Sequence, residues 1–140
     1  MNIRMSRDCD EVNWALLSSI LARVGMASLE PEVHERLFRN SQVVAFAFDS
    51  DALVGFGRAL SDRVKDAGIF DVAVAPEYQG RGIGTAILDR LMNNLAGCNV
   101  ILFANPGRED FYARFGFKMV KTAMARFTDE ERMRKKGIID

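Results

Sequence analysis

The sequence predicts a mixed α/β (α+β) domain built around one central β-sheet. In some segments apolar residues recur at helical spacing, and in others β-branched and aromatic residues form short runs typical of strands. In chain order these segments are a weak strand, two helices, three strands, a helix, a strand, a helix and one or more closing strands. The chain has 140 residues, of which 49% are apolar. We therefore expect one domain, residues 1–140, with a single buried core.

The N-terminal part is predicted to be helical after a short apolar start. The stretch "CDEVNWALLSSILARVG" has aliphatic residues at helical spacing and stops at Gly25. The stretch "EPEVHERLFRN" predicts a shorter helix, because Pro31 suits a first-turn position and Asn40 suits the exit.

Three strands should follow. "QVVAFAF" and "ALVGFGRAL" flank the turn formers "DSD", which indicates a hairpin. "AGIFDVAVAP" predicts a third strand that ends at Pro76, because proline lacks the N–H needed to extend a ladder.

The remaining elements alternate between helix and strand. "GIGTAILDRLMNNLAG" has one broad apolar face over residues 83–95 and ends at Gly97, which predicts a helix. "NVILFA" predicts a buried strand, "REDFYARF" a short helix stopped by Gly116, and "FKMVKTAMARF" the closing strand or strands.

Composition excludes several classes of function. Nineteen basic residues balance 19 acidic residues, so no overall field attracts nucleic acid or an anionic membrane. No apolar run reaches the roughly 18–20 residues that span a bilayer, and the polar N-terminus does not resemble a signal peptide. Cys9 and Cys98 form no CxxC motif, and a single histidine, His34, cannot complete a His/Cys cluster. We expect a soluble, cytoplasmic protein with reduced thiols and no metal site.

The stretch "APEYQGRGIGTAIL" places three glycines and Arg81 at the junction of a strand and a helix. A helix N-terminus presents unpaired N–H groups and a positive dipole end, and therefore binds anions such as phosphates. Glycines at 80, 82 and 84 remove Cβ atoms and permit positive φ. A connecting turn needs only one glycine, so this pattern favours a backbone surface that binds a phosphate-bearing ligand.

Two common nucleotide motifs do not fit this turn. The dinucleotide pattern G-x-G-x-x-G/A fails, because Gly80-x-Gly82 leads to Thr85 and Gly82-x-Gly84 leads to Ile87. The acidic residue expected about 20 positions later is missing, and so is the Gly-Lys-Ser/Thr of a Walker loop. A nucleotide-binding oxidoreductase is therefore disfavoured.

The stretch matches the signature Gln/Arg-x-x-Gly-x-Gly/Ala, here residues 79–84, and so resembles the GNAT superfamily of N-acetyltransferases. "DVAVAPEYQGRGIGTAIL" is similar to that family's fourth strand, pyrophosphate loop and third helix, and "FYARFGF" to its C-terminal tyrosine segment. "NSQVVAFAFDSDALVGFGRALSD" is similar to small members that include plastid arylalkylamine-type enzymes. The resemblance implies a mixed sheet of about six to seven strands flanked by about four helices.

The resemblance to the GNAT superfamily also implies acetyl-CoA as cosubstrate and a set of residues that bind it. The pantetheine would lie along the backbone of Val72 and Val74 like an added strand. An N–H near Val74 would polarise the thioester carbonyl. The pyrophosphate would rest on the loop and helix start, at Gln79, Gly80, Arg81, Gly82, Ile83, Gly84 and Thr85. Asn105 would contact the pantetheine and Arg108 a CoA phosphate, although "NPG" is also an ordinary turn and Arg108 also fits a solvated arginine.

Two residues are catalytic candidates. Tyr112 matches the family's general acid, and a phenol with a pKa near 10 carries its proton at pH 7 for delivery to the CoA thiolate. Its alternative role is a tyrosine at the edge of the core. Asp71, the only charge in its strand, would accept the amine's proton directly or through water; its alternative role is an ion pair with Arg58 across the hairpin.

The predicted function is acetyl transfer from acetyl-CoA to a primary amine, by direct attack in a ternary complex. A non-catalytic acyl-CoA-binding module is the alternative, and it would be indifferent to Tyr112→Phe. The family implies a homodimer as one assembly state. The identity of the acceptor, a small amine or a peptide amine, stays open.

Overall fold

The computed structural model describes residues 1–140 and divides them into two compact units, Met1–Leu102 and Phe103–Asp140. The first unit contains the whole sheet, and the second contains two short helices. The mixed α/β class predicted from the sequence is confirmed. None of the helices is both long enough and apolar enough to cross a membrane.

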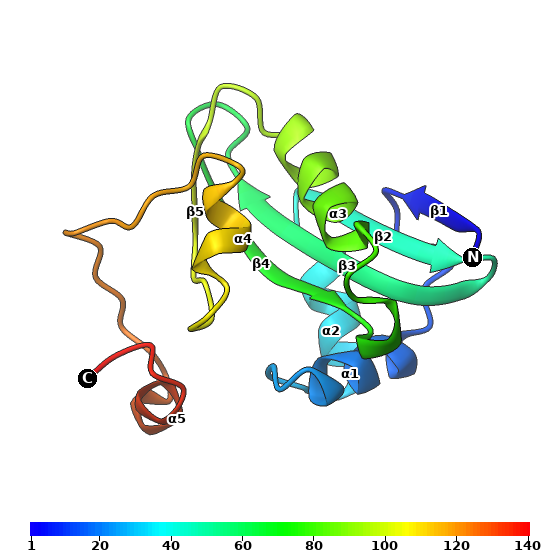
Figure 1. The fold of residues 1–140 in the computed structure, drawn as a ribbon, viewed down its shortest axis with the longest axis horizontal. Coiled ribbons are helices and arrows are strands. Elements are labelled where there is room, and N and C mark those ends of the chain that lie inside the picture. Colours follow the sequence, from blue (N-terminus) through cyan, green and yellow to red (C-terminus); the bar gives the residue numbers. More distant parts are fainter. The chain divides into compact units, whose positions relative to one another are not determined.

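The sheet of the first unit has five strands in the order β1-β2-β3-β4-β5 (Figure 1). They are β1 (Ile3–Ser6), β2 (Val43–Asp49), β3 (Ala52–Ser61), β4 (Asp66–Val74) and β5 (Asn99–Leu102). Strands β1 to β4 pair antiparallel, whereas β5 is parallel to β4. This parallel return requires a crossover connection, which is supplied by α3 (Ile83–Asn93).

Helices cover both faces of this sheet. Helices α1 (Trp14–Arg23) and α2 (Pro31–Arg39) pack on one face, where their buried residues meet an aromatic core. Phe38 of α2 lies between Phe46 and Phe56, with ring centroids 5.4 and 5.9 Å away. Helix α1 begins at Trp14, later than the periodicity indicates, because the side chain of Asn13 accepts a hydrogen bond from the N–H of Leu16 and caps it there.

Helix α3 packs on the opposite face, against the glycines of β3. A Cβ placed on Gly57 would lie 3.1 Å from side-chain atoms of Ile87, Leu91 and Val72, and one on Gly55 only 2.8 Å from Ile87. The two glycines of "ALVGFGRAL" therefore let α3 approach the sheet closely. Alternation places Phe56, between them, in the core on the other face.

The second unit corrects one prediction. It contains α4 (Glu109–Ala113) and α5 (Glu130–Lys135), with an aromatic cluster around Phe111. The segment 117–127, predicted as closing strands, forms no strand. Its pattern has strand propensity, but strand backbone needs a paired neighbour and this segment has none; Met119 and Met124 are 83% and 97% exposed. The structure thus has five strands and five α-helices, where the sequence predicts six to seven strands and about four helices.

Candidate active site

A β-bulge interrupts the ladder between β3 and β4 beside the candidate base. Asp71 and Val72 together stand opposite Gly57, so β4 contributes one residue more than β3. Asp71 has a φ of 57°, in the left-handed region that most side chains avoid but aspartate tolerates. Bulges of this kind redirect side chains and recur next to active sites. The bulge therefore marks Asp71 as a position where the backbone is held in an uncommon conformation.

Arg58 holds the Asp71 side chain. Its Nε donates to Asp71 Oδ2 at 2.8 Å, and the two side chains are only 12% and 22% exposed. The guanidinium also donates to Ser41 Oγ at 3.4 Å and lies 5.2 Å from the centre of the Phe70 ring. The ion pair, one of the two roles that the sequence allows for Asp71, is thus formed. It fixes the carboxylate and leaves Oδ1 without a hydrogen bond from the protein.

Strand β4 has a free edge beyond this bulge. Its ladder with β5 ends at the pair Ile69 and Leu102, so none of residues 70–74 pairs with β5. Val72 and Val74 lie on this free stretch. At its far end, Gln79 Nε2 donates to the carbonyl oxygen of Val74 at 3.0 Å. Unpaired strand backbone of this kind can accept an extended ligand as an added strand.

The glycine turn leads from β4 through a short 3-10 helix, Pro76–Tyr78, into α3. Gly80 and Gly82 have φ values of 77° and 83°, and a Cβ on either would meet nothing within 4 Å. Gly84, in contrast, lies inside the helix and has no positive φ, so it does not use the conformational freedom that glycine permits. Gly82 is the N-cap of α3 and offers no side-chain acceptor. The first N–H groups of α3, at residues 83–85, therefore lack intrahelical partners and face an open approach.

The Arg81 side chain contacts two residues that lie outside the sequence motif, Tyr78 and Met1. Its guanidinium lies 5.5 Å from the centre of the Tyr78 ring, and Nη1 lies 3.3 Å from Met1 Sδ. Tyr78 donates its hydroxyl proton to Asp49 Oδ2 at 2.5 Å, and Asp49 Oδ1 accepts from the N–H of Asn2. The Tyr78 hydrogen bond lowers the pKa of Asp49, and the same bond raises the pKa of Tyr78. The turn is thereby tied to the end of β2.

The second unit contains the other three candidate residues. Tyr112 lies on α4, half-buried, with its ring 5.0 Å from Phe111 and 6.0 Å from Phe117. Burial raises the pKa of the Tyr112 phenol, an effect that the charge of Arg108 partly opposes. Arg108 is the N-cap residue of α4, and its N–H donates to the carbonyl oxygen of Asn105 at 2.9 Å. The three residues therefore belong to one loop–helix segment.

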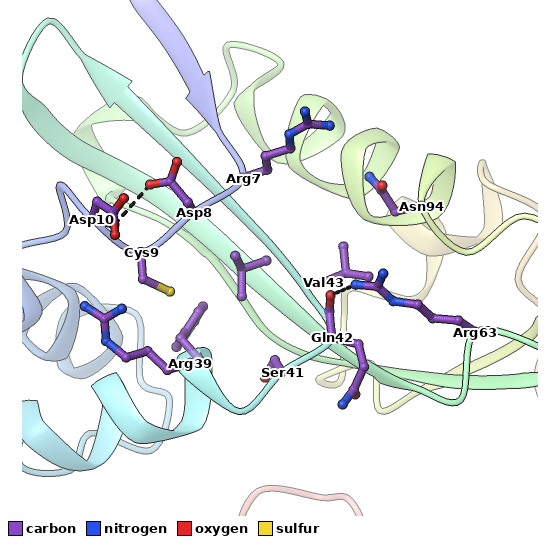
Figure 2. A pocket seen from close by; sticks show the side chains of 12 residues that line it. Arg7, Asp8, Cys9, Asp10, Arg39, Ser41, Gln42, Val43, Arg63 and Asn94 are labelled. Atoms are coloured by element: carbon purple, nitrogen blue, oxygen red, sulfur yellow. Dashed lines mark hydrogen bonds between the residues drawn. The ribbon is translucent and has the colours of Figure 1, made fainter.

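An open hollow of about 470 Å³ lies elsewhere in the first unit, where β1 stops short of the beginning of β2. Figure 2 shows its polar lining, with Arg39 and Cys9 facing Arg63 and Gln42 across the start of β2. Asn94, which follows the C-terminal end of α3, also lines it, so the hollow lies at the opposite end of that helix from the glycine turn. None of the predicted site residues lines it. No group of three or more His, Cys, Asp or Glu side chains is placed to bind a metal ion.

Three residues that the fold places in specific surroundings could not have been found by motif. Tyr78 and Asp49 are 29 residues apart, and only the fold joins them. His34, which the sequence presents as a lone histidine, is 1% exposed, and its Nδ1 has no hydrogen-bond partner. In the sequence, the one indication of a role for these residues is that Tyr78 directly precedes the glycine signature at residues 79–84.

Comparison with known proteins agrees with this geometry. The model of the acetyltransferase (GNAT) family matches residues 11–117. The chain is 36% identical over 110 residues to serotonin N-acetyltransferase 2, chloroplastic, of Oryza sativa subsp. japonica, covering 74% of this chain and 55% of the relative. It is 44% identical over 128 residues to GCN5-related N-acetyltransferase 2, chloroplastic, of Arabidopsis thaliana, covering 79% and 47%. The chain thus spans about half the length of these curated relatives.

Solved structures share the fold. A putative acetyltransferase of the GNAT family from Xanthomonas campestris pv. campestris superposes with a TM-score of 0.81 at 26% identity, covering 91% of this chain and 94% of the other. Glucosamine-6-phosphate N-acetyltransferase from Arabidopsis thaliana superposes with a TM-score of 0.73 at 17% identity, covering 92% and 100%. Because the family model matches residues 11–117, more than half of the sequence, the chain belongs to the GNAT family of acetyltransferases.

Proposed function

We propose that this protein is an acetyl-CoA-dependent N-acetyltransferase that moves an acetyl group to a primary amine by direct attack within a ternary complex. The observation that carries the proposal is the glycine turn at the start of α3. Gly80 and Gly82 combine positive φ with open space, and the N-cap residue supplies no side chain to satisfy the first N–H groups of the helix. Such a surface suits a pyrophosphate, which backbone N–H groups and the helix dipole attract.

The residues around the turn fit the rest of the CoA molecule. Arg81 adds a positive charge beside the unpaired N–H groups, and Tyr78 supports its guanidinium. The free edge of β4 at Val72 and Val74 suits the amide groups of a pantetheine arm. Asn105 and Arg108 remain further candidates for CoA contacts on the basis of the family resemblance. When bound, acetyl-CoA supplies the activated acetyl group as a thioester.

In this proposal, Asp71 accepts a proton and Tyr112 donates one during the transfer. An acceptor ammonium loses two protons as its nitrogen forms the bond to the acetyl carbon and the bond from that carbon to sulfur breaks. One proton goes to Asp71, directly or through water, and later to solvent. Tyr112 donates its phenol proton to the departing thiolate and recovers the second proton from the nitrogen. An N–H near Val74 stabilises the developing charge on the carbonyl oxygen.

The state of Tyr112 suits this role. Burial raises the pKa of its phenol, so the hydroxyl keeps its proton at neutral pH. The contacts of its half-buried side chain are with the aromatic rings of Phe111 and Phe117, so the proton is not committed to another acceptor. A general acid needs both properties.

The names of the relatives guide the choice of acceptors. One relative is a serotonin N-acetyltransferase and another, from Glycine max, is a histone acetyltransferase at 33% identity. We propose a primary amine as the acceptor class and test three kinds of it: an arylalkylamine such as serotonin, a polyamine, and a peptide with a free lysine. The side chains of the first two helices carry both signs of charge and do not favour one of the three.

The test has two stages. Calorimetry with acetyl-CoA, and with adenosine as a matched ligand that lacks the phosphates, measures binding at the turn. Release of free CoA thiol is then followed with each acceptor. We expect acetyl-CoA to bind and one acceptor class to accelerate thiol release. Binding without release for any amine would favour a non-catalytic acyl-CoA-binding module, and absence of binding would overturn the proposal.

A further inference from the structure

The hollow at the start of β2 contains none of the residues assigned to acetyl transfer, and it has the features of a separate binding site. Its volume of about 470 Å³ lies within the range of ligand pockets, roughly 300–1,000 Å³. Cys9, Phe38 and Val44 belong to its lining and are at most 9% exposed, so they form its floor. A buried floor surrounded by a few polar groups is typical of sites for small molecules.

Five charged side chains line this hollow, and they come from segments that are distant in the sequence. Arg7, Asp8 and Asp10 follow β1, Arg39 ends α2, and Arg63 lies in the turn between β3 and β4. Arg39 is paired with Glu35, Nε to Oε2 at 2.7 Å. The other four form no ion pair within the protein. Two guanidinium groups and two carboxylates therefore line the hollow without a partner of opposite charge.

Arg63 is held in place at the edge of the hollow. Its Nη2 donates to the carbonyl oxygen of Gln42, which directs the side chain along the start of β2. The preceding residue, Asp62, fixes the turn, because its Oδ1 accepts from the N–H groups of Val64 and Lys65, both at 2.8 Å. The other N–H groups of the guanidinium have no acceptor within the protein. A donor that is fixed before the ligand arrives loses little conformational entropy on binding.

The two carboxylates lie on the other side of the hollow. Figure 2 shows Asp8 and Asp10 beside Cys9, across the start of β2 from Arg63. It also shows Arg7 directed away from Asp8. The N–H of Asp10 donates to Asp8 Oδ1 at 3.0 Å, and both carboxylate oxygens of Asp10 lack a donor. Groups of opposite charge thus face one another across the hollow.

We propose that this hollow is a second binding site, for a small amino acid in its zwitterionic form. The ligand's carboxylate accepts from Arg63 and Arg7, and its ammonium group donates to Asp8 and Asp10. A simple anion would leave both carboxylates without a partner, and a simple cation would leave both guanidinium groups without one. A zwitterion is complementary to both sets of charges.

The remaining lining indicates which amino acid to test first. Gln42 and Asn94 add amide groups to the lining. Ser41 also lines the hollow, but its hydroxyl already donates to the carbonyl oxygen of Leu37 at 2.7 Å. Amides pair well with another amide, because each has both donors and an acceptor. L-glutamine is therefore the first probe, and L-alanine is the minimal zwitterion.

The first experiment is calorimetry of the whole chain with these two amino acids. Two analogues of glutamine separate its charges: glutaramate lacks the ammonium group, and 4-aminobutanamide lacks the carboxylate. We expect saturable binding of glutamine and at least about tenfold weaker binding of each analogue. No saturable binding of either amino acid up to about 10 mM would overturn the proposal. Glutaramate binding as tightly as glutamine would also overturn it, because the site would then be a simple anion site.

Variants then place the ligand in the hollow. Arg63→Gln removes one guanidinium group and Asp10→Asn one carboxylate. Arg36→Gln, on the exposed side of α2 and outside the hollow, and Asp66→Asn, on the exposed start of β4, are the matched controls. We expect glutamine affinity to fall about tenfold in the first two variants and to stay unchanged in the controls. Unchanged affinity in Arg63→Gln, or an equal loss in Arg36→Gln, would overturn the proposal.

The inference is independent of the proposed acetyl transfer, and one further titration separates the two. Glutamine binding is measured again with CoA present, which has no acetyl group to transfer. Equal glutamine affinity with and without CoA supports a separate site, whereas competition would place glutamine at the cosubstrate site and overturn the inference. A chain that binds glutamine but no acetyl-CoA would refute the proposed function and keep the second site. Arg63→Gln should bind acetyl-CoA as tightly as the wild type, and a loss there would show that the two sites are not separate.

Discussion

Replacing Gly82 by alanine separates the two reasons for a glycine at the start of α3. Gly82 has a φ of 83° and nothing within 4 Å of an added Cβ. An alanine there is strained in the left-handed region by about 1–2 kcal/mol but meets no protein atom. Gly25, with a φ of 77° after α1 and equally open surroundings, offers the same strain away from the candidate site. Both variants should therefore lose about 1–2 kcal/mol of unfolding free energy in urea titrations.

Only Gly82→Ala should bind acetyl-CoA more weakly than the wild type. In Gly82→Ala the methyl group occupies space that a pyrophosphate needs in order to reach the first N–H groups of α3. Loss of one hydrogen bond to a charged oxygen, about 1.5–3 kcal/mol, weakens acetyl-CoA binding roughly tenfold to a hundredfold. Calorimetry on Gly25→Ala should give the wild-type affinity. If Gly82→Ala binds acetyl-CoA as tightly as Gly25→Ala, the glycine serves only its backbone conformation, and the phosphate site lies elsewhere.

Three further predictions concern Tyr112, His34 and Gly57. Tyr112→Phe should lower kcat by about 10² to 10⁴-fold with acetyl-CoA affinity nearly unchanged, as measured by thiol release and calorimetry; equal losses in both would indicate a structural tyrosine. The pKa of His34 is lowered from 6.5 by burial, so below pH 6.5 the unfolded chain binds a proton that the folded protein resists. Stability should therefore fall as the pH decreases from 6.5 towards the folded pKa, by at most about 1.4 kcal/mol per pH unit, and His34→Gln should remove this component. Urea titrations between pH 7.5 and 5.0 check it, and an equal fall in the variant would assign the effect to other groups. Gly57→Ala adds a Cβ 3.1 Å from Ile87 and Leu91, so it should destabilise the fold by about 1–3 kcal/mol; an unchanged urea midpoint would show that α3 can move away.

The sequence predicted the elements whose signals are local. The apolar residues of "GIGTAILDRLMNNLAG" indicate α3 because their period is internal to the segment, and Gly82 indicates the start because its conformation is local too. The closing strands were predicted from the same kind of pattern and do not form, because a strand also depends on a neighbour that no local pattern specifies.

Features that depend on distant partners could be predicted only as alternatives or not at all. The pairing of Asp71 with Arg58 is one of two roles that the sequence allows, since side chains on neighbouring strands of a hairpin are within reach of each other. The bulge at Asp71 was not predicted, because aspartate tolerates a positive φ without requiring it. The link from Tyr78 to Asp49 and the burial of His34 depend on how β2 and α2 pack, which the segments alone do not reveal.

Asp71 and Gly82 both have a positive φ, but the two positions have different chemical requirements. Three residues other than glycine have a positive φ, and of these Ser50 and Arg63 lie in loops, where the strain follows from a tight connection. Asp71 alone lies inside a strand. A glycine would adopt its conformation without strain, yet the position has a carboxylate that Arg58 holds, whereas Gly82 has no side chain and open space around it. The contrast is explained if position 71 contributes a side chain to the reaction and position 82 contributes only its backbone. Asp71→Gly should accordingly relieve the backbone strain and still abolish most of kcat, and a fully active glycine variant would show that the carboxylate serves only the ion pair.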